Sequence, residues 1–109
     1  MQTFVKGNDV SWTNVGEGMR RKVLAYNQEI MTVEVEFDEG GVGKDHSHPH
    51  AQITYVISGE YSYHIEGEAR IMCAGDSIAV EGGKVHGLTC LKAGRVVDVF
   101  SPMREDFVR

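Results

Sequence analysis

The sequence contains few of the residues that mark disulfide-rich, metal-ribbon or membrane-spanning proteins. Only two of its 109 residues are cysteine and only two are proline. Cys73 and Cys90 form no Cys-x-x-Cys pair, which excludes a zinc ribbon and a dithiol redox motif. No apolar run approaches the roughly 18 residues that span a bilayer, and the first residues lack the apolar core of a signal peptide. We therefore expect a cytoplasmic protein with two small buried thiols, a disulfide between them being the alternative.

Positive charge is also scarce in this chain. Eleven lysines and arginines face 16 aspartates and glutamates, which gives a formal net charge of -5. A nucleic-acid surface needs clustered cations to neutralise phosphates, so we expect neither a nucleic-acid nor a membrane partner. The hydrophobic fraction of 41% is typical of a folded globular protein, and the length is that of one domain. We predict a single domain over residues 1–109 with its core at about 21–100.

Short strands separated by glycine-containing turns account for most of the sequence. Val33, Val35 and Phe37 alternate with polar residues, and no segment sustains a helical period. The predicted strands span residues 21–26, 30–37, 51–58, 60–65, 69–73, 77–80, 85–91 and 95–100. Residues 66–68 and 92–94 are predicted to be hairpin turns in which glycine supplies a positive φ. About eight strands at this spacing predict an all-β protein, a closed jelly-roll barrel without open sheet edges.

Histidines are concentrated in one short segment. Three of the five, His46, His48 and His50, lie within five positions of one another. In an extended strand these side chains and that of Gln52 share parity, so they project to the same side. A metal needs a three-dimensional shell of ligands, and His86, which begins another predicted strand, is the candidate from a neighbouring strand.

The arrangement of these residues resembles the cupin superfamily. The two motifs are Gly40-x5-His46-x-His48-x3-Gln52-x6-Gly59 and Gly75-x5-Glu81-x-Gly83-x2-His86. The resemblance implies a barrel that binds one divalent transition metal ion (nickel, zinc, manganese or iron) through His46, His48, Gln52 and His86. Gln52 departs from the commoner glutamate, as Glu81 does from proline and Cys90 from asparagine. A shell of neutral donors retains the full charge of the metal and favours an anionic ligand.

The motifs do not assign a role to two other histidines or to one aspartate. His50 lies outside the matched spacing and is either a ligand, a supporting group or a rim residue. His64 lies on the polar side of its strand, opposite to Tyr63, and is predicted to be exposed to solvent. Asp98 shares a face with Phe100, and the alternation alone does not decide whether that face is the barrel interior.

Nearly the whole chain resembles short cupins of the pectin-degradation, KdgF type. The similarity includes residues 20–26, the histidine segment and the terminal Asp98-Val99-Phe100-Ser101-Pro102-x-Arg104-Glu105-Asp106-Phe107. It implies an isomerase-like enzyme that opens and ketonises 4,5-unsaturated uronate monosaccharides from pectin or alginate. Asp98, Phe100 and Arg104 correspond to the functional residues of that family. We hypothesise that Asp98 carries a proton, that Phe100 packs against the sugar, and that Arg104 and the metal bind its carboxylate.

Two other functions remain open on the sequence alone. A metal-dependent cupin dioxygenase uses a similar ligand set, and a non-catalytic sugar-binding cupin retains the ligands without needing Asp98. The partner expected in the KdgF-type interpretation is a small anionic sugar. We also expect a homodimer, as cupins commonly form, to which the segment around Trp12 could contribute.

Overall fold

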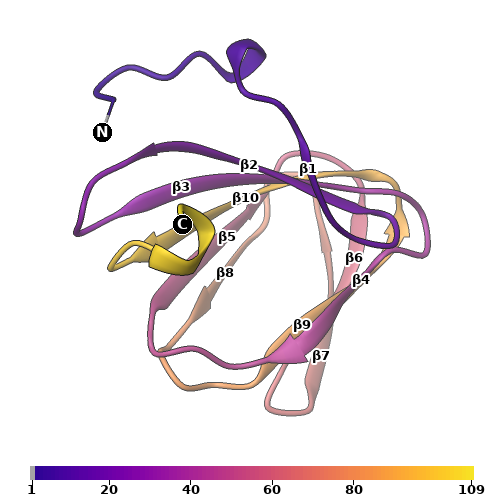
Figure 1. The fold of residues 1–109 in the computed structure, drawn as a ribbon. Helices are drawn as coiled ribbons and strands as arrows, with labels where there is room; N and C mark the ends of the chain where they lie inside the picture. Colours follow the sequence, from indigo (N-terminus) through magenta and orange to yellow (C-terminus); the bar gives the residue numbers. More distant parts are fainter. Residues whose placement is uncertain (1) are drawn as a thin grey trace.

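The computed structural model describes residues 2–109, whose strands form two antiparallel sheets that face one another (Figure 1). No helix in this part of the chain has the length and apolar character needed to cross a membrane. The strands are β1 (Thr13–Gly16), β2 (Met19–Tyr26), β3 (Met31–Phe37), β4 (Val42–His46), β5 (Ala51–Val56), β6 (Glu60–Ile65), β7 (Glu68–Cys73), β8 (Ser77–Val80), β9 (His86–Lys92) and β10 (Gly94–Ser101). Two single-turn 3-10 helices, η1 (Gly7–Asp9) and η2 (Glu105–Phe107), lie near the ends.

The two sheets are formed by strands that are far apart in the sequence. The six-stranded sheet has the order β1-β2-β3-β10-β5-β8, and the four-stranded sheet has the order β4-β9-β6-β7. Successive strands cross repeatedly between the sheets, so that β4 and β5 belong to opposite sides of the barrel. The prediction of an all-β jelly-roll barrel is confirmed.

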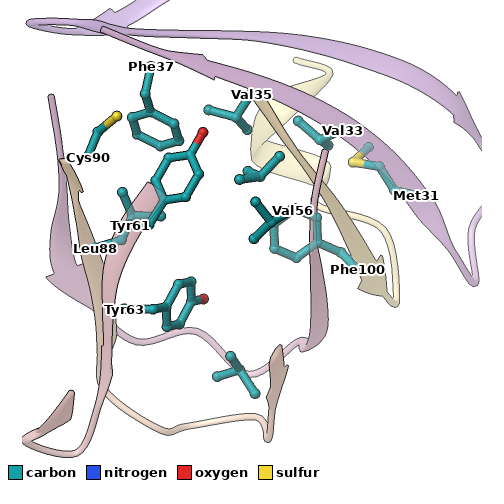
Figure 2. Close-up of a cluster of buried hydrophobic side chains, with 12 residues drawn as sticks. Met31, Val33, Val35, Phe37, Val56, Tyr61, Tyr63, Leu88, Cys90 and Phe100 are labelled. Atoms are coloured by element: carbon teal, nitrogen blue, oxygen red, sulfur yellow. The ribbon is translucent and has the colours of Figure 1, made fainter. Parts of the chain in front are cut away.

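The core lies between the sheets and follows from the alternation of apolar and polar residues. In β3 the residues from Met31 to Phe37 are alternately buried and partly exposed, and β5 alternates in the same way. Figure 2 shows these side chains pointing toward Tyr61, Tyr63 and Leu88 of the opposite sheet. Each fully buried aliphatic side chain contributes about 1.5–3 kcal/mol through its removal from water. Burial of this cluster between the sheets therefore stabilises the barrel.

The structure has two strands that the sequence analysis did not predict. β1 is short and polar, and β4 carries Gly43, Lys44 and Asp45, so neither shows an apolar alternation. Both are edge strands, which bury few side chains and so leave a weak sequence signal. The other eight strands agree with the prediction to within two residues at each end.

Of the two predicted hairpin turns, one is correct. Glu66 and Gly67 both have positive φ and join the paired strands β6 and β7. The prediction for residues 92–94 is wrong, because β9 and β10 belong to different sheets and this segment is a corner between them. Gly94 is needed there for another reason: a Cβ atom at this position would collide with the backbone of Ser58.

The two cysteines have different environments. Cys90 is buried and Cys73 is exposed, and both are free thiols. The prediction of two buried thiols is therefore wrong for Cys73, which ends the edge strand β7, a strand that has a neighbour on one side only. Burial raises the pKa of the Cys90 thiol above its usual value.

Candidate functional site

Three histidines converge at one end of the barrel from separate parts of the chain. His46 ends β4 and His86 begins β9, and these two residues are directly paired across the four-stranded sheet. His48 lies in the connection from β4 to β5. One ring nitrogen from each of the three lies within 4.8 Å of the others, which is close enough to hold one metal ion.

The geometry that brings them together differs from the predicted single extended strand. The segment leaves β4 at His46 and enters β5 at Ala51, crossing from one sheet to the other. The carbonyl of His48 accepts a hydrogen bond of 2.8 Å from the amide of Gly83, which anchors the crossing to the loop before β9. The ligands therefore come from two facing sheets, and this gives the three-dimensional shell that one strand lacks.

Each imidazole is oriented by a backbone carbonyl on its outer side. Nδ1 lies 2.8 Å from the Lys44 carbonyl in His46, 3.1 Å from the His50 carbonyl in His48, and 2.9 Å from the Lys84 carbonyl in His86. Carbonyl oxygens only accept hydrogen bonds, so they favour the tautomer with hydrogen on Nδ1. That tautomer leaves the lone pair of Nε2 free, as in many histidine metal ligands.

Gln52 faces these nitrogens with its amide oxygen. Oε1 lies 2.9 Å from Nε2 of His48 and 3.2 Å from Nε2 of His86. The amide nitrogen of the same side chain donates to Thr54 Oγ1 and to Asp98 Oδ1, each at 3.1 Å. These two hydrogen bonds fix the orientation of the amide, with the oxygen toward the histidines.

The chemistry of this donor set fits a cation. A neutral imidazole has a single N–H, yet His48 and His86 each have an oxygen acceptor beside both ring nitrogens. Burial lowers the pKa of both imidazoles, which disfavours the doubly protonated form. A metal ion between the Nε2 atoms and Gln52 Oε1 would use the lone pairs that otherwise face one another.

Asp98 lies on the interior face of β10. The alternation of residues in this strand had not decided which face is the interior. It is opposite Thr54 in the register between β10 and β5, and Thr54 donates a 2.6 Å hydrogen bond from Oγ1 to Asp98 Oδ1. Burial raises the pKa of Asp98 to about 6, although the hydrogen bonds from Thr54 and Gln52 oppose this rise. Among residues 2–109, hydrogen-bond donors reach the carboxyl group of Asp98 only at Oδ1. Its other oxygen, Oδ2, therefore remains available to a ligand.

Thr54 is a site residue that the sequence analysis missed. It is almost fully buried and lies between Gln52 and Asp98. The available signal was its parity with Gln52 in the same predicted strand.

Phe100, Phe107 and Arg104 form one side of the site, in which the arginine packs against the two aromatic rings. Phe100 is opposite Gln52 in the sheet, and its ring centroid lies 5.6 Å from that of His48. The side chain of Arg104 is only 12% exposed and pairs with Asp106 through Nε and Nη2, at 3.1 and 3.0 Å. Its guanidinium lies 4.3 Å from the centroid of Phe107, so the terminal segment is packed against the barrel.

A cleft of about 830 Å³ opens onto these groups. Its lining includes His46, Gln52, Asp98, Phe100 and Arg104. The predicted ligands and the predicted catalytic residues thus lie in the same part of the molecule. A monosaccharide is small enough for a cleft of this volume.

His50 and His64 do not belong to the group of three converging histidines. The ring of His50 lies 5.4 Å from that of His48, and it lines a different pocket with Asp106. His64 lies on the polar face of its strand, as predicted, but its side chain is only 29% exposed. Its Nε2 lies 3.1 Å from Asp45 Oδ1, a carboxylate that reaches across Gly87 on the outer face of the four-stranded sheet.

Comparison with known proteins agrees with the fold. The cupin domain family matches residues 33–100. The chain is 36% identical over 110 aligned positions to the pectin degradation protein KdgF of Dickeya dadantii (strain 3937), covering 99% of this chain and all of that protein.

Two solved structures are similarly close. KdgF from Halomonas sp. has a TM-score of 0.93 at 36% identity, over 98% of this chain and 99% of its own. An RmlC-like cupin from Shewanella frigidimarina has a TM-score of 0.95 at 37% identity, over 98% and 96%. Because these relatives match it over almost its entire length, the chain belongs to the cupin superfamily and, within it, to the family of KdgF-type pectin degradation proteins.

Proposed function

We propose that this protein is a metal-dependent enzyme that converts 4,5-unsaturated uronate monosaccharides from pectin or alginate breakdown into the linear 5-keto-4-deoxyuronate. The observation that carries the proposal is the position of Asp98, whose carboxyl group accepts a hydrogen bond from the amide that faces His48 and His86. A proton carrier and a cation site thereby adjoin the same cleft. The similarity to KdgF proteins, which are named for pectin degradation, supports the substrate class.

His46, His48, His86 and Gln52 would hold the metal in this proposal. When bound, a divalent ion supplies Lewis-acid stabilisation of negative charge on a substrate oxygen, and no change of oxidation state is needed. The amide of Gln52 contributes no charge of its own, so an anionic substrate is favoured at the site. Imidazole ligands suit nickel, zinc and iron, and the amide oxygen of Gln52 is a ligand that manganese also accepts.

In the ring opening the bond between C1 and the ring oxygen breaks, the C1 hydroxyl loses a proton and the ring oxygen gains one, which leaves an aldehyde at C1 and an enol at C5. The ketonisation that follows requires two further proton movements that Asp98 can serve. The enol becomes a ketone when C4 gains one proton and the C5 hydroxyl loses one, so the product is an isomer of the substrate. Oδ2 of Asp98 has no hydrogen-bond partner in residues 2–109 and is free to deliver the proton and to recover it.

Phe100 and Arg104 position the substrate. The ring of Phe100 offers an apolar face beside His48 against which a sugar can pack, and it limits access of water. Arg104 is held by Asp106 through Nε and Nη2, which leaves Nη1 for an oxygen of the substrate. Neither side chain needs to change its protonation state.

The test follows the ultraviolet absorbance of the conjugated double bond. Purified metal-loaded protein is incubated with the unsaturated monomers prepared separately from pectin and from alginate. We expect the absorbance to fall much faster than in buffer for at least one of them, with the linear ketone detected by NMR. Loss no faster than in buffer for both monomers would contradict the proposed function.

The absorbance assay, combined with measurements of oxygen consumption and of binding, separates the proposed function from the two alternatives. A cupin dioxygenase would consume oxygen, which an oxygen electrode detects, whereas the proposed isomerisation proceeds equally well under nitrogen. A sugar-binding protein without activity would bind the monomer and leave its absorbance unchanged. The expected result is turnover without oxygen consumption.

A further inference from the structure

One arginine on the interior face of the barrel has no role in the proposed chemistry. β2 alternates so that Met19, Arg21 and Val23 face inward, where Met19 and Val23 pack against the core. Arg21 is paired in register with Val35, a buried residue of β3. A charged side chain thus occupies a position at which the pattern of the strand places apolar residues.

Arg21 differs from its neighbours in making no direct ion pair with an acid among residues 2–109. Arg20, on the opposite face of the same strand, pairs with Glu36 at 2.8 Å and with Asp38 at 2.9 Å. Arg104 pairs with Asp106. Within residues 2–109 the Arg21 guanidinium makes no hydrogen bond to a side chain or carbonyl and no ion pair. Burial lowers its pKa, and the charge of Asp106, an acid that pairs with Arg104, opposes this shift.

An aromatic ring holds Arg21 at the edge of the cleft. Its Cζ lies 3.7 Å from the centroid of Phe107, the ring that Arg104 also contacts. A guanidinium that stacks on a ring face keeps the N–H groups of its edge available for an acceptor. Arg21 lines the cleft together with His46, Asp98 and Arg104.

A partly buried cation without a direct ion pair is costly, and a bound anion lowers that cost. The planar fork of a guanidinium matches a carboxylate, with which it forms two parallel charge-assisted hydrogen bonds. Asp98, an acid on the interior face, already accepts hydrogen bonds from Thr54 and Gln52 through Oδ1. The unpaired edge of Arg21 therefore suits an anion that comes from outside the chain.

We propose that Arg21 binds the carboxylate of the sugar acid and so selects uronates over neutral sugars. This inference rests on the proposed function and names a contact within it. The apolar backing by Phe107 and the proximity of Arg104 place two guanidiniums on the same side of the cleft. The ring of the substrate would then extend from this subsite toward Asp98 and the histidines.

The test compares Arg21→Gln and Arg21→Lys with Arg20→Gln, which makes the same change one residue away on the opposite face. Steady-state kinetics on the unsaturated uronate should show KM raised roughly 10- to 100-fold in Arg21→Gln, with kcat altered much less. Lysine keeps the charge and loses the fork, so Arg21→Lys should raise KM by a smaller factor. Arg20→Gln should leave KM unchanged. Circular dichroism verifies that each variant is folded, and if Arg21→Gln is unfolded, Arg21→Lys decides.

A binding measurement tests the role of Arg21 without depending on enzymatic activity. Isothermal titration of metal-loaded protein with saturated galacturonate and with galactose needs no turnover. We expect the wild type to bind galacturonate more tightly than galactose, and Arg21→Gln to lose that preference. Equal preference in both proteins, or an unchanged KM in active Arg21 variants, would overturn the inference. An inactive wild type that retains the Arg21-dependent preference would overturn the proposed function instead.

Discussion

Gln52 donates a hydrogen bond of 3.1 Å from Nε2 to Oδ1 of Asp98, while Oε1 of the same amide faces the imidazoles of His48 and His86. A single neutral side chain thereby joins the cation site to the acid beside it. Glutamate, the commoner residue at this position in cupins, has no proton to donate when it is ionised. The amide of Gln52 therefore serves the cation site through its oxygen and Asp98 through its N–H group.

Replacing Gln52 by glutamate should separate metal binding from turnover. The carboxylate can still ligate a metal and adds a favourable charge to the shell, so metal affinity should be retained. It also removes the donor to Asp98 and places a second negative charge beside it. We expect kcat on the unsaturated uronate to fall by about 100-fold, the lower part of the range for a disturbed general acid.

Metal content by mass spectrometry and the absorbance assay together check this result. Gln52→Asn, which keeps the amide on a shorter side chain, serves as the comparison. A Gln52→Glu variant with wild-type turnover would show that the hydrogen bond to Asp98 is dispensable.

Replacing Asp98 by asparagine should abolish most of the activity without removing the metal. The amide has nearly the same shape as the carboxyl group, but it cannot carry a proton. General acid–base groups typically contribute between about 100- and 10,000-fold, and we expect a loss in that range. The exposed Asp9→Asn in η1 is the matched control and should remain fully active. Intact activity in Asp98→Asn would rule out Asp98 as the proton carrier.

Removal of the metal should lower the stability of the barrel end that the histidines form. A ligand at 100 times its dissociation constant stabilises the folded state by about 2.7 kcal/mol, provided that it does not bind the unfolded chain. For a domain of this size the melting temperature should fall by roughly 10 °C when a chelator is added. Differential scanning calorimetry with and without the chelator measures the difference.

The His46→Ala variant supplies the control for that experiment. His46 is an exposed member of the group, so its removal leaves no internal cavity. The variant should fold and should show a much smaller response to metal. An unchanged response would mean that the stabilising metal binds elsewhere.

Replacing Gly87 by alanine should weaken metal binding from outside the site. A Cβ atom at Gly87 would lie 2.7 Å from the carbonyl oxygen of Gly43 and would collide with the carboxylate of Asp45. Because β4 must move to relieve these contacts, His46 at its end is displaced from His86. We expect a metal affinity at least tenfold lower by competitive titration with a chromophoric chelator.

The control for this change is another glycine in open surroundings. A Cβ atom at Gly7 would meet no other atom within 4 Å, and the residue has no positive φ, so Gly7→Ala should bind metal like the wild type. Equal affinities in Gly87→Ala and wild type would contradict the link between β4 packing and the site.

The two thiols should differ in their reaction with a thiol reagent such as Ellman's reagent. Cys73 is exposed, whereas Cys90 is buried and its pKa is raised. The thiolate is the reactive form, so the folded protein should release about one equivalent of chromophore rapidly and a second only in denaturant. In Cys73→Ser the rapid equivalent should disappear. Rapid reaction of both thiols in the folded wild type would contradict the assigned burial of Cys90.

Local sequence determined the strands that bury side chains on one face. The alternation through β3, β5 and β6 predicted these elements closely, because a strand with one buried face has a period of two. The spacing of the histidines and its resemblance to cupins identified the residues that now lie together. The edge strands β1 and β4 were not predicted and the corner at residues 92–94 was predicted wrongly, because their conformation depends on which sheet each neighbour joins.

Only the tertiary structure decided how those residues face one another. Parity suggested one line of ligands in a single strand, whereas the chain crosses between sheets after His46 and so surrounds the site. The inward orientation of Asp98 required the pairing of β10 with both β3 and β5, since its own alternation fits either face. Arg21 appeared as an interior charge only when β2 was placed against β3. Long-range pairing selects which face of each strand is buried, and periodicity within one strand carries no information about that choice.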